Sequence, residues 1–260
     1  MKGIILTISS ILACIVLNAQ VEPDIVNTSG MSAQYTGGYL AWSVGEPVIG
    51  SITSTNASIN QGFLQSWEQR QKTLMLTLWL EGLWNGSNLN KAQDENGDHF
   101  IENKADDINV LLYNATNYQL VYSSEDNSLS TMGKVELTLQ PNYSATYYLA
   151  ITHRNHLETW SSNPVSFAGD TIAYDFTTSA TKAYGDNQKQ VSQGKFAIMV
   201  GDVNQDGVVD ISDLVAMDAD LTTGTVAYIV YDLNGDGVVD ISDLVKIDEN
   251  LTNGAVVITP

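Results

Sequence analysis

Oxygen-bearing side chains recur at fixed intervals in one stretch near the C-terminus. Counted from Asp202, they stand at positions 1, 3, 5, 9 and 12, with a glycine at position 6. Calcium is a hard cation that takes roughly six to eight oxygen ligands, and a tight turn points alternate side chains inward around it. The spacing therefore predicts a calcium loop of the EF-hand type, with a backbone carbonyl at position 7 as a further ligand. The predicted ligands are Asp202, Asn204, Asp206, Val208, Asp210 and Asp213.

The same pattern returns thirty residues later. Its predicted ligands are Asp232, Asn234, Asp236, Val238, Asp240 and Asp243. The stretches beginning at Gly201 and Tyr231 share 15 of 22 aligned residues, which indicates an internal duplication whose halves pack about a pseudo-twofold axis. Position 12 is Asp in both loops, where the helix–loop–helix sensors have the longer Glu. We expect two calcium ions.

Charge supports a cation in this region. The formal net charge of the chain is −19, and residues 201–260 hold 12 carboxylates against one basic residue, Lys246. Such an acidic chain is a poor partner for nucleic acid or an anionic membrane surface. Four carboxylates crowded in each loop repel one another until a divalent ion relieves them. Metal binding and folding should then be coupled, so we expect a structural role for calcium rather than a sensing one.

Periodicity predicts the elements that position these loops. Apolar residues follow each loop at roughly helical spacing, which predicts one amphipathic helix per loop. They are Ile211, Leu214, Val215 and Leu221, and likewise Ile241, Leu244, Val245 and Leu251. Upstream, "DINVLLY", "KVELTL" and "YYLAITH" alternate with a period of two, as half-buried strands do, and "SSEDNS" and "QPNYSA" read as turns. The fold class predicted is mainly β: an antiparallel, immunoglobulin-like sandwich with a small helical C-terminal pair.

The organisation of the chain follows from these patterns. The apolar run from Gly3 to Leu17 predicts a signal peptide, residues 1–19, with no membrane span and with lipidation at Cys14 as the minor alternative. A β segment (20–71), a β-sandwich domain (72–199) and the paired calcium loops (200–260) should follow. We expect a secreted protein, released or held at the cell surface. Its only cysteine lies in the signal peptide, so metal and packing must replace disulfides.

Residues 201–252 resemble a type I dockerin, whose unit of one calcium loop and one helix is present twice. The resemblance implies a protein partner, a cohesin-like module, and a place in polysaccharide-degrading assemblies. At the positions where that family commonly has Ser-Thr recognition pairs, this chain has Ile211–Ser212 and Ile241–Ser242. "YYLAITHRNHLETWSSNPVSF" and "LAWSVGEPVIGSITSTNASINQGFLQ" are similar to segments of secreted bacterial and surface proteins, and that similarity implies no activity.

Three other features allow competing interpretations. His153 and His156 form an H-x-x-H pair near Glu158, but along a single strand the two rings would lie on opposite faces, so we favour an anchoring role for residues 153–156 over catalysis. "DENGDHF" at Asp94 reads as a solvated turn, with a third calcium site as the alternative. Trp79 and Trp84 are the candidates for a sugar-stacking surface.

The sequence thus predicts a non-enzymatic, calcium-binding interaction module. No phosphate-binding glycine loop and no nucleophile elbow occur. The alternatives are a carbohydrate-binding protein that uses the sandwich, or a glycan-active enzyme without a recognisable motif.

Overall fold

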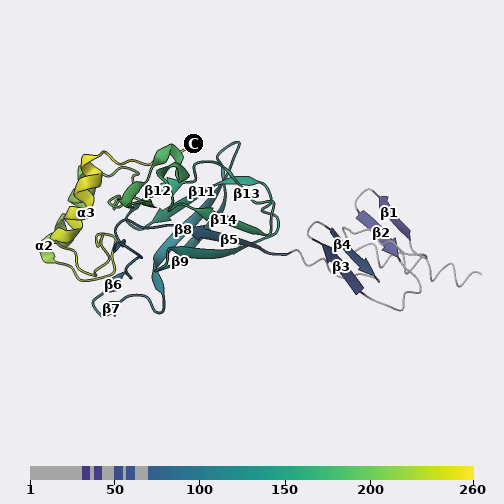
Figure 1. Ribbon diagram of the computed structural model, residues 1–260, viewed down its shortest axis with the longest axis horizontal. Helices are drawn as coiled ribbons and strands as arrows, with labels where there is room; N and C mark the ends of the chain where they lie inside the picture. The colour runs from purple at the N-terminus through teal and green to yellow at the C-terminus, as the bar shows by residue number, and fades with distance from the viewer. Residues whose placement is uncertain (1–30, 36–37, 43–49, 55–56, 62–69) are drawn as a thin grey trace, which may run out of the picture. The chain divides into compact units, whose positions relative to one another are not determined.

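The structure is a computed structural model that describes residues 31–35, 38–42, 50–54, 57–61 and 70–260 (Figure 1). Its contacts divide the chain into two compact units, with the boundary between Glu68 and Gln69. The predicted signal peptide, Cys14 included, lies outside the described residues.

The first unit contains two short antiparallel hairpins. Strand β1 (Met31–Tyr35) pairs with β2 (Gly38–Trp42), and β3 (Gly50–Ser54) pairs with β4 (Ala57–Gln61). These four strands lie within the β segment predicted at residues 20–71.

One sheet of the second unit has three strands in the order β10-β5-β14. Strand β10 (Lys134–Leu139) is the predicted "KVELTL" strand, and its alternate residues Val135, Leu137 and Leu139 are buried as predicted. It pairs antiparallel with β5 (Lys72–Thr77), whereas β14 (Thr171–Asp175) pairs with β5 in parallel. The expectation of a purely antiparallel sandwich is wrong at this pair, because β14 reaches β5 by a long connection rather than by a hairpin.

The other sheet follows the order β12-β11-β8-β9, with β13 added to β11, and all its pairs are antiparallel. Its strands are β8 (Lys104–Asn114), β9 (Leu120–Ser130), β11 (Thr146–His153), β12 (His156–Trp160) and β13 (Val165–Ser166). "SSEDNS" lies inside β9 and is not the predicted turn. As an edge strand with register shifts against β8, β9 tolerates polar residues on its outer face.

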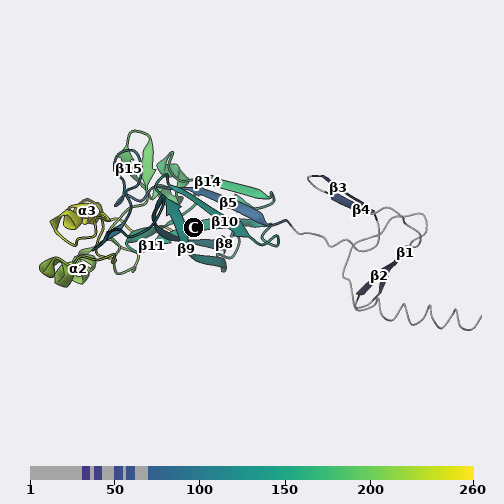
Figure 2. The same ribbon diagram turned by 90° about the horizontal axis from the view of Figure 1, so that it is seen from below.

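The two sheets enclose one apolar core (Figures 1 and 2). It combines Leu74 and Leu76 of β5 with Val110 and Leu112 of β8 and Leu149 of β11, all almost fully buried. The remaining elements are β6 (Gln93–Asp94), β7 (Gly97–Asp98), β15 (Lys189–Ser192), β16 (Lys195–Ala197) and the short 3-10 helices η1 (Ala180–Lys182) and η2 (Tyr184–Asp186).

Two helices, α2 (Ile211–Thr223) and α3 (Ile241–Thr252), lie together at one end of this unit (Figure 1). They confirm the prediction of one helix per loop. Asp210 and Asp240 begin them as N-caps, each accepting a hydrogen bond from the backbone N–H two residues later and closing a capping box with the Asp at position 12. The last acidic residues of each loop therefore also start its helix.

The helices and loops share a second core that both halves of the repeat build equally. Positions 2, 8 and 16 contribute equivalent buried side chains: Val203 and Leu233, Val209 and Val239, Met217 and Ile247. Leu157 and Val200 of the β region, together with Ala255 after α3, complete this core. The paired loops are thus packed directly onto the β region, and residues 69–260 form one compact unit.

Gly82 shows how closely the two parts fit. A Cβ atom at this residue would lie 2.0 Å from the carbonyl oxygen of Leu233 and 3.2 Å from the His156 ring. We expect Gly82→Ala to lower the free energy of unfolding by about 1–3 kcal/mol, since the second loop must move away. Calorimetric thermal unfolding measures the effect. Gly169→Ala is the control, because its Cβ would meet its nearest atom at 3.5 Å; equal stability of the two variants would contradict the close fit.

Candidate functional site

The first loop closes on itself through its own polar groups. Asp202 accepts a hydrogen bond from the Gly207 N–H on Oδ2 at 3.2 Å, and Asn204 accepts one from Asp206 N–H at 2.9 Å. Asp213 accepts from the N–H groups of Val203, at 2.9 Å, and Asp210. Gly207, with φ of +87°, makes the bend predicted at position 6. The side chains at positions 1, 3 and 12 are therefore held by backbone N–H groups of their own loop.

The second loop repeats these contacts at equivalent positions. Asp232 accepts from the Gly237 N–H at 3.0 Å, and Asp243 accepts from the N–H groups of Leu233 and Asp240 at 2.8 and 3.0 Å. Gly237 has φ of +82°. The equivalence of the two loops confirms the internal duplication.

Crossed pairing relates the two halves. Val209 N–H donates to Ala255 O and Val257 N–H to Gly207 O, so the first loop pairs with the segment after α3. Val239 N–H donates to Thr225 O and Ala227 N–H to Gly237 O, so the second loop pairs with the segment after α2. Each bond of one half has its counterpart thirty residues away, as the predicted pseudo-twofold relation requires.

The pairing also orients the predicted backbone ligands. In each antiparallel bridge the hydrogen bonds involve the residues flanking Val208 and Val238, so the carbonyls of these two valines point away from the paired strand. Their N–H groups donate within the loop, at 3.0 Å to Asp206 and Asp236. Both carbonyls therefore face the side of the loop where the carboxylates lie, as position 7 of a calcium loop demands.

Burial makes the ionised form of three loop carboxylates less favourable. Burial, together with the negative charge of Asp213, raises the pKa of Asp202 to about 6. Burial also raises the pKa of Asp232 to about 6, with the Asp243 charge adding to the shift and the Arg154 charge opposing it. The pKa of Asp243 is raised by burial as well. A cation in each loop would favour the charged carboxylates and remove this cost.

The donor set fits a hard divalent cation. Asp202 is 3% exposed, and its Oδ1 atom is buried without a hydrogen-bond partner. A calcium ion would supply the missing partner, held by the side chains at positions 1, 3, 5 and 12 and the carbonyl at position 7. Within residues 70–260, no three His, Cys, Asp or Glu side chains converge closely enough to form a metal cluster as they stand. The loop carboxylates instead accept hydrogen bonds from loop N–H groups, and calcium would have to draw them together.

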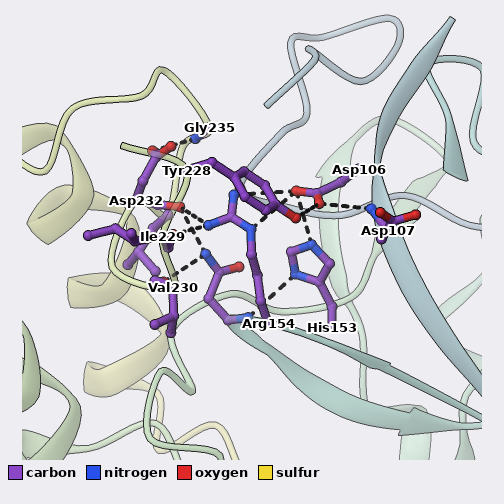
Figure 3. Close-up of polar contacts among 12 residues, drawn as sticks. Asp106, Asp107, His153, Arg154, Tyr228, Ile229, Val230, Asp232 and Gly235 are labelled. Carbon is purple, nitrogen blue, oxygen red and sulfur yellow. Dashed lines mark hydrogen bonds and ion pairs between the residues drawn. The ribbon is translucent and has the colours of Figure 1, made fainter. Parts of the chain in front are cut away.

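The β11–β12 turn supports the second loop (Figure 3). Asn155 Nδ2 donates to the carbonyls of Val230 and Asp232 at 3.0 and 2.9 Å, and Arg154 donates to Ile229 O and, at 3.1 Å, to Asp232 O. These contacts agree with the anchoring role expected for residues 153–156.

Behind the turn lies a buried ion pair that the sequence did not reveal. Asp106 is fully buried, 3.3 Å from Arg154 and 3.2 Å from His153, and accepts from the Tyr228 hydroxyl at 2.5 Å. Although burial raises the pKa of Asp106, the His153 and Arg154 charges outweigh it and hold the pKa well below its usual range. Asp106, Arg154 and Tyr228 are far apart in sequence, so no local spacing could have found this cluster.

The two histidines are placed differently from the expectation. The chain reverses between them, so His153 and His156 are cross-strand neighbours whose Nδ1 atoms lie 2.8 Å apart, not residues on opposite faces. Both rings are buried, and Gly82 N–H donates to His156 Nε2 at 3.1 Å. Burial, with the His153 and Arg154 charges, keeps the pKa of His156 well below its usual value. A neutral His156 that joins Gly82 to the turn serves the packing of the second loop.

The other candidates take structural places. Trp79 is 6% exposed in the sandwich core, its ring centroid 4.8 Å from that of the half-buried Trp84, so the predicted pair of exposed stacking rings is wrong for Trp79. Trp79 belongs to the sandwich core, and Trp84 packs against that core while remaining half-buried. Asp94 sits in the β6–β7 hairpin and accepts from Asn96 N–H at 2.7 Å, which confirms the predicted turn.

Comparisons with known proteins give few matches. No protein-family model matches the chain, and no curated protein matches it. Two matching solved structures are crystal structures of mutant type II cohesin–X–dockerin complexes from Acetivibrio cellulolyticus. The N-terminal interface mutant matches with 15% identity and a TM-score of 0.39, over 69% of this chain and 95% of that chain. The C-terminal interface mutant matches with 14% identity and a TM-score of 0.37, over 71% and 97%. Similarities at TM-scores this low do not establish a shared fold or function.

A search for membrane-crossing helices among the described residues found none of sufficient length and apolar character.

Proton release tests the carboxylate assignment. With pKa values of about 6, Asp202 and Asp232 are each roughly half protonated at pH 6 and fully ionised at pH 8. Calcium needs the ionised form, so its affinity should fall as the pH falls through about 6. Titrating calcium into metal-free protein should release about one proton per chain at pH 6 and almost none at pH 8. Asp202→Asn should release fewer protons, and equal release at both pH values would contradict the assignment.

Proposed function

We propose that this chain is a secreted, calcium-stabilised interaction module of an extracellular or cell-surface assembly. Its C-terminal pair binds two calcium ions through residues 202–213 and 232–243 and presents a protein-binding surface on α2 and α3. The observation that carries the proposal is a pair of exposed aliphatic side chains at the start of each helix, repeated by the duplication.

These side chains are Ile211 and Val215 on α2 and Ile241 and Val245 on α3. Their exposed fractions are 70%, 71%, 73% and 69%, although the sequence placed them with the apolar residues of each amphipathic helix. Spaced four residues apart, the two members of each pair share one helix face. Leu214 and Leu221 are half-buried against the shared core, as predicted. Exposed aliphatic side chains gathered on one surface are typical of a protein-binding site.

Metal and surface are linked through the helix starts. Asp210 and Asp240 are both loop residues and N-caps, and Asp213 and Asp243 close both the loops and the capping boxes. Ile211 and Ile241 follow these caps directly. Calcium that fixes each loop therefore also fixes the first turn of each helix, where the aliphatic pairs lie.

The partner is expected to be a protein with an apolar face, and a cohesin-like module is the candidate that the dockerin resemblance implies. That resemblance also supports a role in polysaccharide degradation. Secretion rests on the apolar run at residues 1–19. The alternative of glycan binding by the sandwich is weakened by the burial of Trp79.

Calorimetry with circular dichroism tests the calcium half of the proposal. Calcium titrated into chelator-treated protein should bind at two sites and increase the helical signal, because each ion fixes a capping box. The double variant Asp202→Ala, Asp232→Ala should lose both effects while keeping the β signal. Failure of the unsubstituted protein to bind calcium would overturn the proposal.

Charge placed on the aliphatic pairs tests the surface. Val215→Glu with Val245→Glu should abolish calcium-dependent binding to purified cohesin modules, since a carboxylate cannot enter an apolar contact without a large desolvation cost. Met132→Glu is the control, because Met132 is 57% exposed on the turn before β10. Surface plasmon resonance with calcium and with chelator measures both. Equal loss in the control, or unchanged binding by the double variant, would contradict the assignment of this surface.

A further inference from the structure

We infer that the two loops bind calcium unequally and in order, the second loop first, because the β11–β12 turn holds it ready for the metal. The inference rests on the proposed calcium binding and goes beyond it, since the sequence repeat alone predicts two equal sites. It assigns Asn155 and Arg154 as positioning residues for the second site.

The second loop is held from outside the repeat. Asn155, fully buried, donates through Nδ2 to Asp232 O, so it fixes the backbone of the residue that supplies the position 1 carboxylate. Gln93 N–H donates to Gly235 O at 3.0 Å. Gly235 and Gly237 are buried against the β region, where added Cβ atoms would lie 2.2 Å from Leu83 Cδ2 and 3.1 Å from Gln93 C. These contacts therefore hold the backbone of the second loop in place without a bound metal.

The first loop has an exposed middle. Asn204, Gln205 and Asp206 are all exposed. Its contacts with the β11–β12 turn are a hydrogen bond from Gly201 N–H to Asn155 O at 2.8 Å, just before the loop, and one from Gln205 Nε2 to Arg154 O at 3.4 Å. The ligands at positions 3 and 5 thus lie on a segment that the rest of the fold covers little.

The residue at position 4 also makes the second loop better ordered for metal binding than the first. Both loops need a left-handed backbone there, with φ of +59° at Gln205 and +75° at Gly235. A glycine adopts this conformation freely, whereas a residue with a Cβ atom is strained in it. Gly235 N–H also donates to Asp232 Oδ1 at 2.8 Å, while the equivalent Asp202 Oδ1 is left without a partner. The position 1 carboxylate is therefore oriented in the second loop and only partly oriented in the first.

The charges around the two loops do not make the first site the tighter one. Each loop holds four carboxylates at the same positions, so the direct attraction for calcium is similar. The Arg154 guanidinium lies near the second loop, but its charge is paired with Asp106 at 3.3 Å. The two sites therefore differ in the free-energy cost of ordering their ligands around the metal. A loop that is already ordered before binding avoids this cost.

Matched ligand deletions distinguish the sites. Asp206 and Asp236 both stand at position 5 and are both exposed, so replacing either by Ala should disturb only its own site. Calcium titration of the unsubstituted protein should show two steps that differ by roughly tenfold or more. Asp206→Ala should lose the weaker step and Asp236→Ala the tighter one. Two equal steps, or loss of the tighter step in Asp206→Ala, would overturn the inference, whereas absence of any binding would overturn the proposed function itself.

Second substitutions test the cause. Asn155→Ala should weaken the tighter step about tenfold and leave the weaker step within about twofold, as expected for a positioning residue. Asn187→Ala is the matched control, a buried amide that donates to Val256 O at 2.9 Å, away from the second loop. Gln205→Gly removes the backbone strain of the first loop, so the weaker step should become several-fold tighter even if Asn155→Ala does not fold. An unchanged weaker step in Gln205→Gly, or an unchanged tighter step in folded Asn155→Ala, would contradict the inference.

Discussion

The arrangement of residues 201–260 depends on how two tight turns accommodate four carboxylates each. N–H groups within each loop satisfy part of that charge, and the capping boxes of α2 and α3 use another part to start the helices. The carboxylate charge that these hydrogen bonds do not satisfy is seen in the raised pKa values of Asp202 and Asp232 and in the unpartnered Oδ1 of Asp202. A divalent cation is the simplest group that would relieve it, and a chain whose only cysteine lies in its predicted signal peptide has no disulfide to use in its place.

The loops are also part of a larger packed unit. Crossed pairing ties each loop to the segment behind the other helix, and the shared core takes equivalent residues from both halves. The β region breaks this symmetry through contacts with the second loop. Asn155 and Arg154 donate hydrogen bonds to Asp232 O, and Gly82 packs against Leu233 O. The two helices keep equivalent aliphatic pairs exposed. One end of this unit thus combines a supported loop, proposed to bind calcium, with a repeated exposed aliphatic surface (Figure 1).

The sequence predicted what local spacing controls. The bends at Gly207 and Gly237, the two helices and the strands β8, β10 and β11 depend on residues close together in the chain, and the structure confirms these backbone elements, although β11 is buried on both faces and not half-buried as predicted. The sequence did not predict features that depend on contacts between distant segments. These are the parallel β14–β5 pair, the Asp106–Arg154–Tyr228 cluster and the burial of Trp79. His153 and His156 show the limit clearly, since one reversal of the chain turned residues expected on opposite faces into neighbours. The exposure of the aliphatic pairs was not predicted, because periodicity shows which residues share a helix face, not what covers that face.

A crystal structure of the full chain grown with calcium tests the central claim most directly. One ion should lie in each loop, with oxygens at about 2.3–2.6 Å from the side chains at positions 1, 3, 5 and 12 and from the carbonyls of Val208 and Val238, and with Asp210 and Asp240 at position 9 bound directly or through a water. Asp202 Oδ1 should be among these ligands, and anomalous scattering should identify the metal. Loops that keep their internal hydrogen bonds at saturating calcium, with no ion between the carboxylates, would contradict the account.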